Sequence, residues 1–271
     1  TCSGAGISTA APDCFNSSSQ DVWYKFTTTH ATMSISLEAS SGLNHGFELI
    51  ALNCDGVVEN CVNSNASGNS EFLLRNNFQI GQVYYIRVFN AGSNISSANF
   101  GICVRSYTVP GNNTCNGATL LTPGQTCVTT PVSLSGATFD GNLPACTDAA
   151  SQDVWFRFVA DNPVMNITMS GANSLNHGFE LYQDSCSGAL KTCVNDNPSG
   201  IGESYLSNNM SVGKTYFIRI FNAASALNFN SFTICVRSYS VPANDVCNNA
   251  IILQPGASCI DTPAQFGAAS I

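Results

Sequence analysis

Apolar and polar residues alternate in short runs along most of the chain. Clusters of Gly, Asn, Ser or Pro separate the runs, and no segment shows a persuasive helical period. Within residues 83–90, Tyr84, Ile86 and Val88 point to one face of an extended strand, and Arg87 points to the other. The runs lie at residues 22–28, 32–38, 47–52, 71–75, 83–89 and 99–105. The pattern predicts an all-β chain of antiparallel β-sandwich modules with jelly-roll character.

The same module occurs twice in the sequence, with a period of 132 residues and no gap. DVWYKF at 21–26 returns as DVWFRF at 153–158, and LNHGFEL at 43–49 returns unchanged at 175–181. The stretch NNTCNGATLLTPGQTCVTTP at 112–131 reappears as NDVCNNAIILQPGASCIDTP at 244–263, which opens a third copy. The sequence therefore predicts part of a repeating array, or a subunit that continues into another one.

The period divides the chain into three parts. Residues 1–110 form the first repeat, 111–242 the second, and 243–271 begin a third repeat or form a donated segment. A linker and a predicted hairpin over 116–132 open the second repeat, and 243–264 repeat that element. Because residue 1 corresponds to residue 133, we expect the first repeat to lack a hairpin of its own. Donation of 243–264 to a neighbouring subunit would then build a head-to-tail fibre.

Charge is sparse and mostly negative. Charged residues make up 10% of the 271 residues, and nine Lys and Arg against 17 Asp and Glu give a net charge of −8. Without a basic stripe to neutralise phosphates, nucleic acid is not an expected partner. No apolar run approaches the roughly 20 residues that cross a bilayer, so membrane insertion is not expected either.

The chain has 13 cysteines, and all except Cys2 follow the period. No C-x-x-C pair is present and the histidines do not lie beside the cysteines, so the spacing favours disulfides in an oxidising compartment over a metal site. An odd number leaves one partner outside the chain. The corresponding positions are Cys14, Cys54, Cys61, Cys103, Cys115 and Cys127 in one copy, and Cys146, Cys186, Cys193, Cys235, Cys247 and Cys259 in the next.

The closest cysteines predict two disulfides, Cys54–Cys61 and Cys186–Cys193, each across a loop that contains Gly. Two schemes remain open for the others. The first pairs Cys2 with Cys14, Cys127 with Cys146, Cys103 with Cys115 and Cys235 with Cys247, and gives Cys259 a partner outside the chain. The second pairs Cys14 with Cys103 and Cys115 with Cys127, and leaves Cys2 unpaired.

Aromatic and catalytic candidates are few. Trp23 and Trp155 follow Gln-Asp-Val, and their apolar neighbours favour core anchors over sugar-stacking rings. His45 and Glu48 are the best catalytic pair by proximity, with His177 and Glu180 as their copy. In an extended strand, however, such a pair points to opposite faces.

Asn-His-Gly also fits a turn in which Gly46 supplies the permissive backbone. No nucleophile, metalloprotease or phosphate-binding motif appears, and the chain is not expected to be an enzyme.

Four motifs in order carry a family resemblance. They are DVWYKF, the cysteine loop 54–61, VYYIRVFN at 83–90 and FGICVRSYTVPGNNTCNGATLL at 100–121. With them the chain resembles the bacterial pre-peptidase C-terminal domain, in the cysteine-bearing form that large secreted proteins of the Bacteroidetes carry in tandem. The resemblance implies a secreted, non-catalytic β-sandwich, accessory or adhesive, exported in many relatives by the type IX system and retained at the cell surface.

Some members of that family bind calcium through acidic loops. The corresponding loops here are 61–71 and 193–204, and the second offers Asp196 and Glu203 as weak candidate ligands. Asx-turns in a polar loop are the alternative interpretation. No other cofactor is expected.

Two functions follow from the sequence. The first is a structural or adhesive repeat of a stalk or filament on a cell surface, whose partners are neighbouring copies of the same repeat or subunit. The second is an accessory module that holds carbohydrate or protein for a secreted hydrolase, with surface glycans or matrix proteins as partners.

Overall fold

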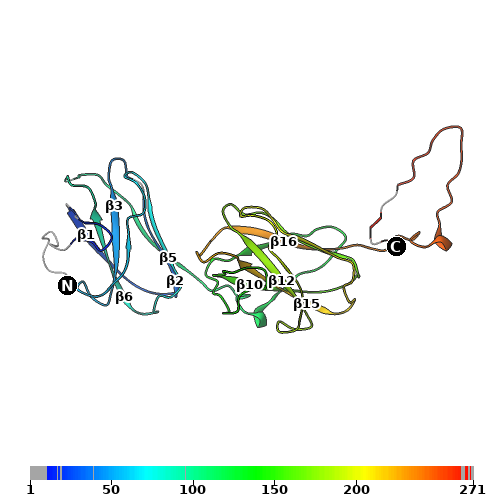
Figure 1. The fold of residues 1–271 in the computed structure, drawn as a ribbon, viewed down its shortest axis with the longest axis horizontal. Coiled ribbons are helices and arrows are strands. Elements are labelled where there is room, and N and C mark those ends of the chain that lie inside the picture. The colour runs from blue at the N-terminus through cyan, green and yellow to red at the C-terminus, as the bar shows by residue number, and fades with distance from the viewer. Residues whose placement is uncertain are drawn as a thin grey trace. The chain divides into compact units, whose positions relative to one another are not determined.

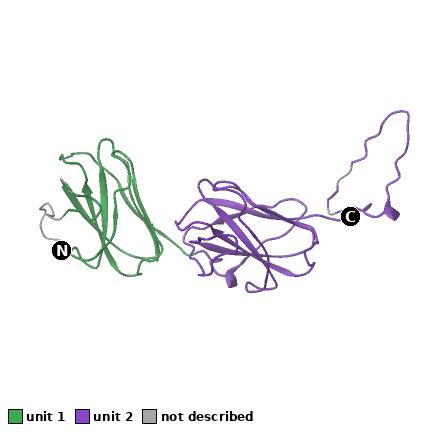
Figure 2. Cartoon of the chain, viewed as in Figure 1, with its two compact units in different colours: residues 1–109 green, residues 110–271 purple. Residues whose placement is uncertain are grey.

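The computed structural model describes residues 11–263 except 17, 19, 39 and 95, together with 266, 267 and 269 (Figure 1). Contacts divide the chain into two compact units, Thr1–Val109 and Pro110–Ile271, called here the first and second unit (Figure 2). Within the described residues, strands dominate, and the helical elements are the short 3-10 turns η1 (Cys115–Gly117) and η2 (Cys247–Asn249). The all-β, disulfide-bonded sandwich prediction is confirmed.

In the described part of the first unit, seven strands form two antiparallel sheets, with orders β1-β6-β3-β4 and β5-β2-β7. All the predicted runs become strands, whereas β4 was missed because its sequence VENCV carries a polar pair in the middle. The strands are β1 (Gln20–Thr27), β2 (Thr32–Leu37), β3 (His45–Ala51), β4 (Val58–Val62), β5 (Glu71–Arg75), β6 (Val83–Asn90) and β7 (Ile102–Tyr107).

The alternation in β6 separates the two faces of its sheet as the sequence predicts. Tyr84, Ile86 and Val88 are buried in the core between the sheets. Arg87 lies on the opposite, outer face, where its neighbours across the sheet are Trp23 and Glu48.

The second unit repeats these seven strands and adds two. Its sheets have the orders β13-β12-β15-β10-β8 and β14-β11-β16-β9. The repeated strands are β10 (Asp153–Val159), β11 (Met165–Met169), β12 (His177–Gln183), β13 (Ala189–Val194), β14 (Ser204–Ser207), β15 (Thr215–Asn222) and β16 (Ser231–Ser238). The added strands, β8 (Thr119–Leu120) and β9 (Thr130–Ser133), precede them in the chain.

Strands β8 and β9 do not form the hairpin predicted over 116–132. β8 pairs in parallel with β10, and β9 pairs antiparallel with β16, so the two strands enter different sheets. Between them, Ser238 N donates to the carbonyl of Gly124 at 2.9 Å. Pairing with the edges of both sheets lets Leu121 and Val132 enter the core.

Residues 111–137, called here the closing segment, complete the core of the second unit. Leu121, Val132 and Leu134 from this segment are buried in one cluster with Val154 and Phe156 of β10. The segment therefore supplies both the last strand of each sheet and part of the apolar interior.

The closing segment allows a matched pair of substitutions. Leu121 is 4% exposed, whereas its neighbour Leu120 is 58% exposed. Leu121→Ala should lower the free energy of unfolding of the second unit by about 2–4 kcal/mol, because it leaves a cavity in the core. Leu120→Ala should change it by less than about 0.5 kcal/mol. Urea unfolding measures both values, and equal effects would contradict the closing role.

Candidate functional site

A buried ion cluster lies on the outer face of the larger sheet in the second unit. Arg219 of β15 donates to Asp153 Oδ2 from Nε at 2.9 Å and from Nη2 at 2.5 Å. Its Nη1 lies 3.4 Å from Glu180 Oε2 and donates to the carbonyl of Asn142 at 2.9 Å. The sheet register places Glu180 directly opposite Arg219, so the backbone itself brings the charges together.

The first unit repeats this cluster with the corresponding residues. Arg87 Nε donates to Asp21 Oδ2 at 2.8 Å, and Arg87 Nη1 donates to Glu48 Oε2 at 3.2 Å. Breaking a buried pair would leave an uncompensated charge, so these residues fix the outer face of each sheet.

Burial and neighbouring charges together shift the pKa values of the cluster in the second unit. It raises the pKa of Asp153 to about 6, against the opposing effect of Arg219. Burial and the hydrogen bond to Glu180 raise the pKa of Tyr182 to about 12. Burial opposes the charge of Arg219, but Asp153 and Glu180 outweigh it and raise the pKa of the guanidinium.

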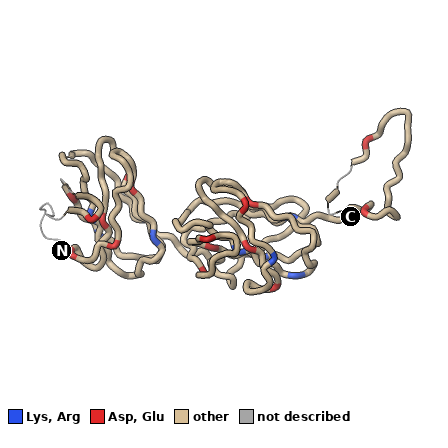
Figure 3. The backbone as a smooth tube through the Cα atoms, viewed as in Figure 1, with Lys and Arg blue, Asp and Glu red and all other residues tan. Residues whose placement is uncertain are grey.

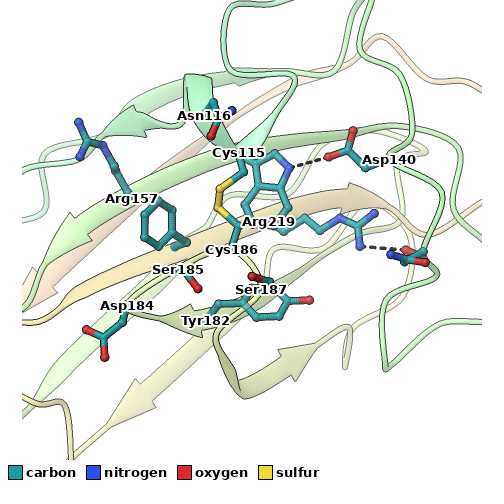
Figure 4. Close-up of a pocket in the computed structure, with 13 residues that line it drawn as sticks. Cys115, Asn116, Asp140, Arg157, Tyr182, Asp184, Ser185, Cys186, Ser187 and Arg219 are labelled. Carbon is teal, nitrogen blue, oxygen red and sulfur yellow. Dashed lines mark hydrogen bonds between the residues drawn. A yellow bond between two sulfur atoms is a disulfide. The ribbon is translucent and has the colours of Figure 1, made fainter.

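A pocket of about 750 Å³ lies over this cluster. Figure 4 shows the Cys115–Cys186 disulfide, which lines the pocket. Trp155 lines it too, and its Nε1 donates to Asp140 Oδ2 at 3.1 Å. Cys115 comes from the closing segment, so this segment forms one wall of the pocket.

The side chains open to solvent in the pocket are polar. Asn116, Arg157 and Asp184 line it and are exposed, and Tyr182 is half-buried. Amide, guanidinium and carboxylate groups around an aromatic floor suit a ligand rich in hydroxyl groups. Trp155 is buried, so its ring supports the pocket rather than presenting a face to a ligand.

Trp155 is buried, as the sequence predicts, but it lies outside the apolar cluster between the sheets, and Trp23 is only half-buried, so Trp23 is not a core anchor. Val154 and Phe156 face the core, and the alternation of β10 therefore places Trp155 on the outer face with Arg219. Trp23 occupies the same position on β1 and is half-buried.

The disulfides differ from every predicted pairing. The Cα–Cα distances are 5.5 Å in Cys14–Cys61, 5.7 Å in Cys146–Cys193, 6.1 Å in Cys115–Cys186 and 5.7 Å in Cys127–Cys235. The predictions Cys54–Cys61 and Cys186–Cys193 are wrong, and so are both open schemes where the described residues test them. Cys54 also forms a disulfide. Cys2 lies outside the described residues.

The strand β4 explains why neighbouring cysteines do not pair. Cys54 lies in the turn before β4, and Cys61 lies on β4 opposite Glu48. The extended strand carries Cys61 away from that turn, and Cys61 pairs with Cys14 instead.

Glu48 helps to position Cys14, the disulfide partner of Cys61. Its Oε1 accepts a hydrogen bond from Asp13 N at 2.7 Å, which places Cys14 beside Cys61.

The described part of the first unit has no counterpart of the closing segment at the two corresponding sheet edges. Among the described residues, no strand lies beside β1 or beside the outer edge of β7. Val22 is 46% exposed and Tyr24 is 40% exposed, whereas the corresponding Val154 and Phe156 are 0% and 2% exposed. The first unit therefore presents an apolar surface where the second unit has a covered core.

The third-repeat segment, residues 243–269, also exposes apolar side chains. Its described residues from Val246 to Pro263 are all exposed and contain no strand, although the sequence predicts a hairpin there. Its apolar side chains include Leu253 and Phe266, the counterparts of Leu121 and Leu134. Asp245 and Asp261 are its charged residues, so little charge opposes its burial (Figure 3).

Three cysteines in the described part of the chain are free and exposed: Cys103, Cys247 and Cys259. They correspond to Cys235, Cys115 and Cys127 respectively in the disulfides of the second unit. They therefore lie on the open edge of the first unit and on the third-repeat segment.

The catalytic candidates do not form a pair. His45 Nε2 lies 2.8 Å from the carbonyl of Glu38, whereas Glu48 contacts Arg87 on the other face. Gly46 belongs to β3 rather than to a turn. A Cβ atom at this position would lie 2.7 Å from the Phe89 ring and 2.6 Å from the carbonyl of Val62, so close packing requires glycine.

The copied pair, His177 and Glu180, follows the same pattern. His177 Nε2 lies 2.9 Å from the carbonyl of Ser170, and burial lowers the pKa of this histidine.

The loop that carries the calcium candidates is held by hydrogen bonds instead. Glu203 is buried, and its carboxylate accepts hydrogen bonds from Asn197 N at 2.9 Å and from Asp196 N at 3.3 Å. Its oxygens thus face backbone N–H donors. Among the described residues, no group of three or more His, Cys, Asp or Glu that could hold a metal ion is found.

The family model for galactose binding domain-like modules associated with type IX secretion matches residues 2–102 and 111–234. The chain belongs to this family. The match supports a secreted domain of the Bacteroidetes type, but it is not a match to the pre-peptidase C-terminal domain. Together with the disulfides, membership indicates a secreted or extracellular module that binds carbohydrate or has a structural role, in a family that is typically non-catalytic.

No curated protein matches the chain. Among solved structures, a conserved protein of unknown function from Pseudomonas aeruginosa is 8% identical, with 80% of this chain and 77% of that one covered and a TM-score of 0.22. A fucolectin from striped bass serum is 13% identical, with 81% and 82% covered and a TM-score of 0.22. These low scores imply nothing about a ligand. No helix among the described residues is long and apolar enough to cross a membrane.

The raised pKa of Asp153 predicts a pH dependence of stability. A carboxyl with a pKa of about 6 when folded and 3.8 in its ordinary state stabilises the fold most below pH 4, and this contribution is lost as the pH rises through 6. Relative to Asp153→Asn, the wild-type chain should lose up to about 3 kcal/mol of unfolding free energy between pH 4 and pH 7. Urea unfolding across this range measures the difference, and a constant difference would contradict the assignment.

Proposed function

We propose that the chain is a structural and adhesive repeat module of an extracellular surface protein or filament, and that it assembles head to tail. In this assembly, the third-repeat segment of one copy covers the open edges of the first unit of the next copy. The observation that supports the proposal is the closing segment, which adds one strand to each sheet of the second unit.

The closing segment defines how the third-repeat segment would bind. Residues 119 and 120 pair with 156 and 157, so residues 251 and 252 pair with Tyr24 and Lys25. Leu253 then enters the core as Leu121 does, and Phe266 replaces Leu134. Burying these two side chains contributes roughly 1.5–3 kcal/mol each, in addition to the backbone hydrogen bonds of two added strands.

This contact joins different surfaces of the two copies. The donated segment lies after the second unit in the chain, and its binding site lies on the first unit, so each added copy presents a new open edge. A contact of this kind continues into a linear array rather than closing as a dimer. Covered sheets and disulfide-bonded units suit a filament that must persist outside the cell.

The alternation of β8 provides a matched test of assembly. Leu253→Asp would place a carboxylate in the core of the neighbouring copy and should weaken association by at least about a hundredfold. Ile252→Asp, whose counterpart Leu120 faces solvent, should assemble as the wild-type chain does. Light scattering under reducing conditions gives the mass of the particles, and electron microscopy shows whether they are linear.

A wild-type chain that stays monomeric at high concentration would overturn the head-to-tail assembly, and so would an equal loss of assembly in both variants. Material from the native surface in which another segment of a longer polypeptide covers β1 and β7 would also contradict it.

Carbohydrate binding is a second candidate function, and the pocket over Arg219 favours it. Arg157 and Asp184 are exposed there, whereas the first unit carries Lys25 and Leu52 at the corresponding positions and has no described wall from a closing segment. We therefore place a hydroxyl-rich ligand in the second unit.

Two substitutions test this binding site. Arg157→Ala or Asp184→Ala should lower the affinity for a glycan found by array screening about tenfold or more, because each loses a hydrogen bond to a charged group. Lys25→Ala on the first unit is the control and should leave the affinity unchanged. Titration calorimetry measures all three, and an equal loss in the control would exclude the pocket.

A further inference from the structure

We propose that a disulfide between Cys259 of one chain and Cys103 of the next covalently joins successive copies. This inference rests on the proposed head-to-tail assembly and names the bond that makes it permanent. It assigns a partner to two exposed thiols that are free among the described residues.

The disulfide Cys127–Cys235 shows the geometry of such a bond. Cys235 lies on β16, and Cys127 lies in the closing segment between β8 and β9. Their Cα atoms are 5.7 Å apart, within the range of protein disulfides. Because the closing segment covers Cys235, this residue is buried at 2% exposure.

Both partners of the proposed bond occupy the corresponding positions. Cys103 lies on β7 where Cys235 lies on β16, and it is exposed because no described strand covers that edge. Cys259 follows the Pro255–Gly256 turn by the same spacing that separates Cys127 from Pro123–Gly124.

Backbone and side-chain contacts near the existing disulfide fix its register. Ser238 N donates to the carbonyl of Gly124 at 2.9 Å, and Arg237 Nε donates to the carbonyl of Gln125 at 2.8 Å. The first unit keeps both donors as Ser106 and Arg105. A segment that docks through these donors brings Cys259 to Cys103.

The stacking of an arginine on a tyrosine ring is present in both units. Arg105 lies 4.9 Å from the centroid of the Tyr107 ring, and Arg237 lies 4.6 Å from that of Tyr239. The first unit thus holds the guanidinium in the same arrangement before any segment docks, which leaves its Nε available for the incoming carbonyl.

Bond formation is a two-electron oxidation. The thiols of Cys103 and Cys259 lose two protons and two electrons as the S–S bond forms, and a disulfide-containing oxidant accepts both and becomes two thiols. An oxidising extracellular compartment maintains such oxidants. Docking must precede the reaction, because it brings the two sulfur atoms of different chains together.

Mixing two variants tests the bond directly. Both carry Cys247→Ser, which removes the third exposed thiol; one adds Cys103→Ser and the other adds Cys259→Ser. After oxidation with glutathione disulfide, the parent Cys247→Ser chain should give a ladder of covalent multimers on a denaturing, non-reducing gel. Each double variant alone should run as a monomer, and their mixture should give a covalent dimer and nothing larger.

Mass spectrometry of the digested dimer should identify one linked peptide pair, containing Cys103 and Cys259. A ladder that persists in either double variant would overturn the assignment, and so would a parent chain that joins Cys103 to Cys259 within one molecule. Native material in which Cys103 is linked to a peptide outside this sequence would also overturn it.

Light scattering of the same samples separates the bond from the assembly. Multimers that form but fall apart to monomers on the denaturing gel would overturn the disulfide and leave the proposed function standing. A parent chain that stays monomeric in solution would overturn both.

Discussion

The covering of apolar sheet edges by a segment that precedes the seven repeated strands is the constraint on which this structure depends. In the second unit, Leu121 and Leu134 pack over Val154 and Phe156, and the core is closed. The first unit has the same strands, yet Val22 remains 46% exposed. In the second unit, a segment that precedes the seven repeated strands thus adds a strand to both sheets and covers their apolar side chains.

The pocket of the second unit depends on the same segment. Cys115 anchors it to the turn after β12 through Cys186, and this disulfide forms a wall of the pocket over Arg219. The ion cluster itself is present in both units, with Arg87 in the place of Arg219, so it does not depend on closure. Closure adds a walled pocket to an outer face that the sheet has already organised.

Two sequence signals predict the fold: the 132-residue period, and the alternation of apolar and polar residues around Tyr84, Ile86 and Val88. The sequence could also have placed Trp155 outside, since Val154 and Phe156 alternate with it. The sequence could not predict the cysteine pairing, because the Cys14–Cys61 disulfide accompanies a hydrogen bond between Asp13 and Glu48, which are 35 residues apart. The hairpin prediction failed because local turn signals do not reveal which sheet edges are open.

Amide hydrogen exchange in the first unit tests the central claim most directly. In the second unit, Trp155 N donates to the carbonyl of Asn112 at 2.7 Å, and Ser238 N donates to Gly124. The corresponding amides are those of Trp23 and Ser106. They should exchange slowly in the assembled wild-type chain and rapidly in Leu253→Asp, whereas equal exchange in both chains would contradict closure by a neighbouring copy.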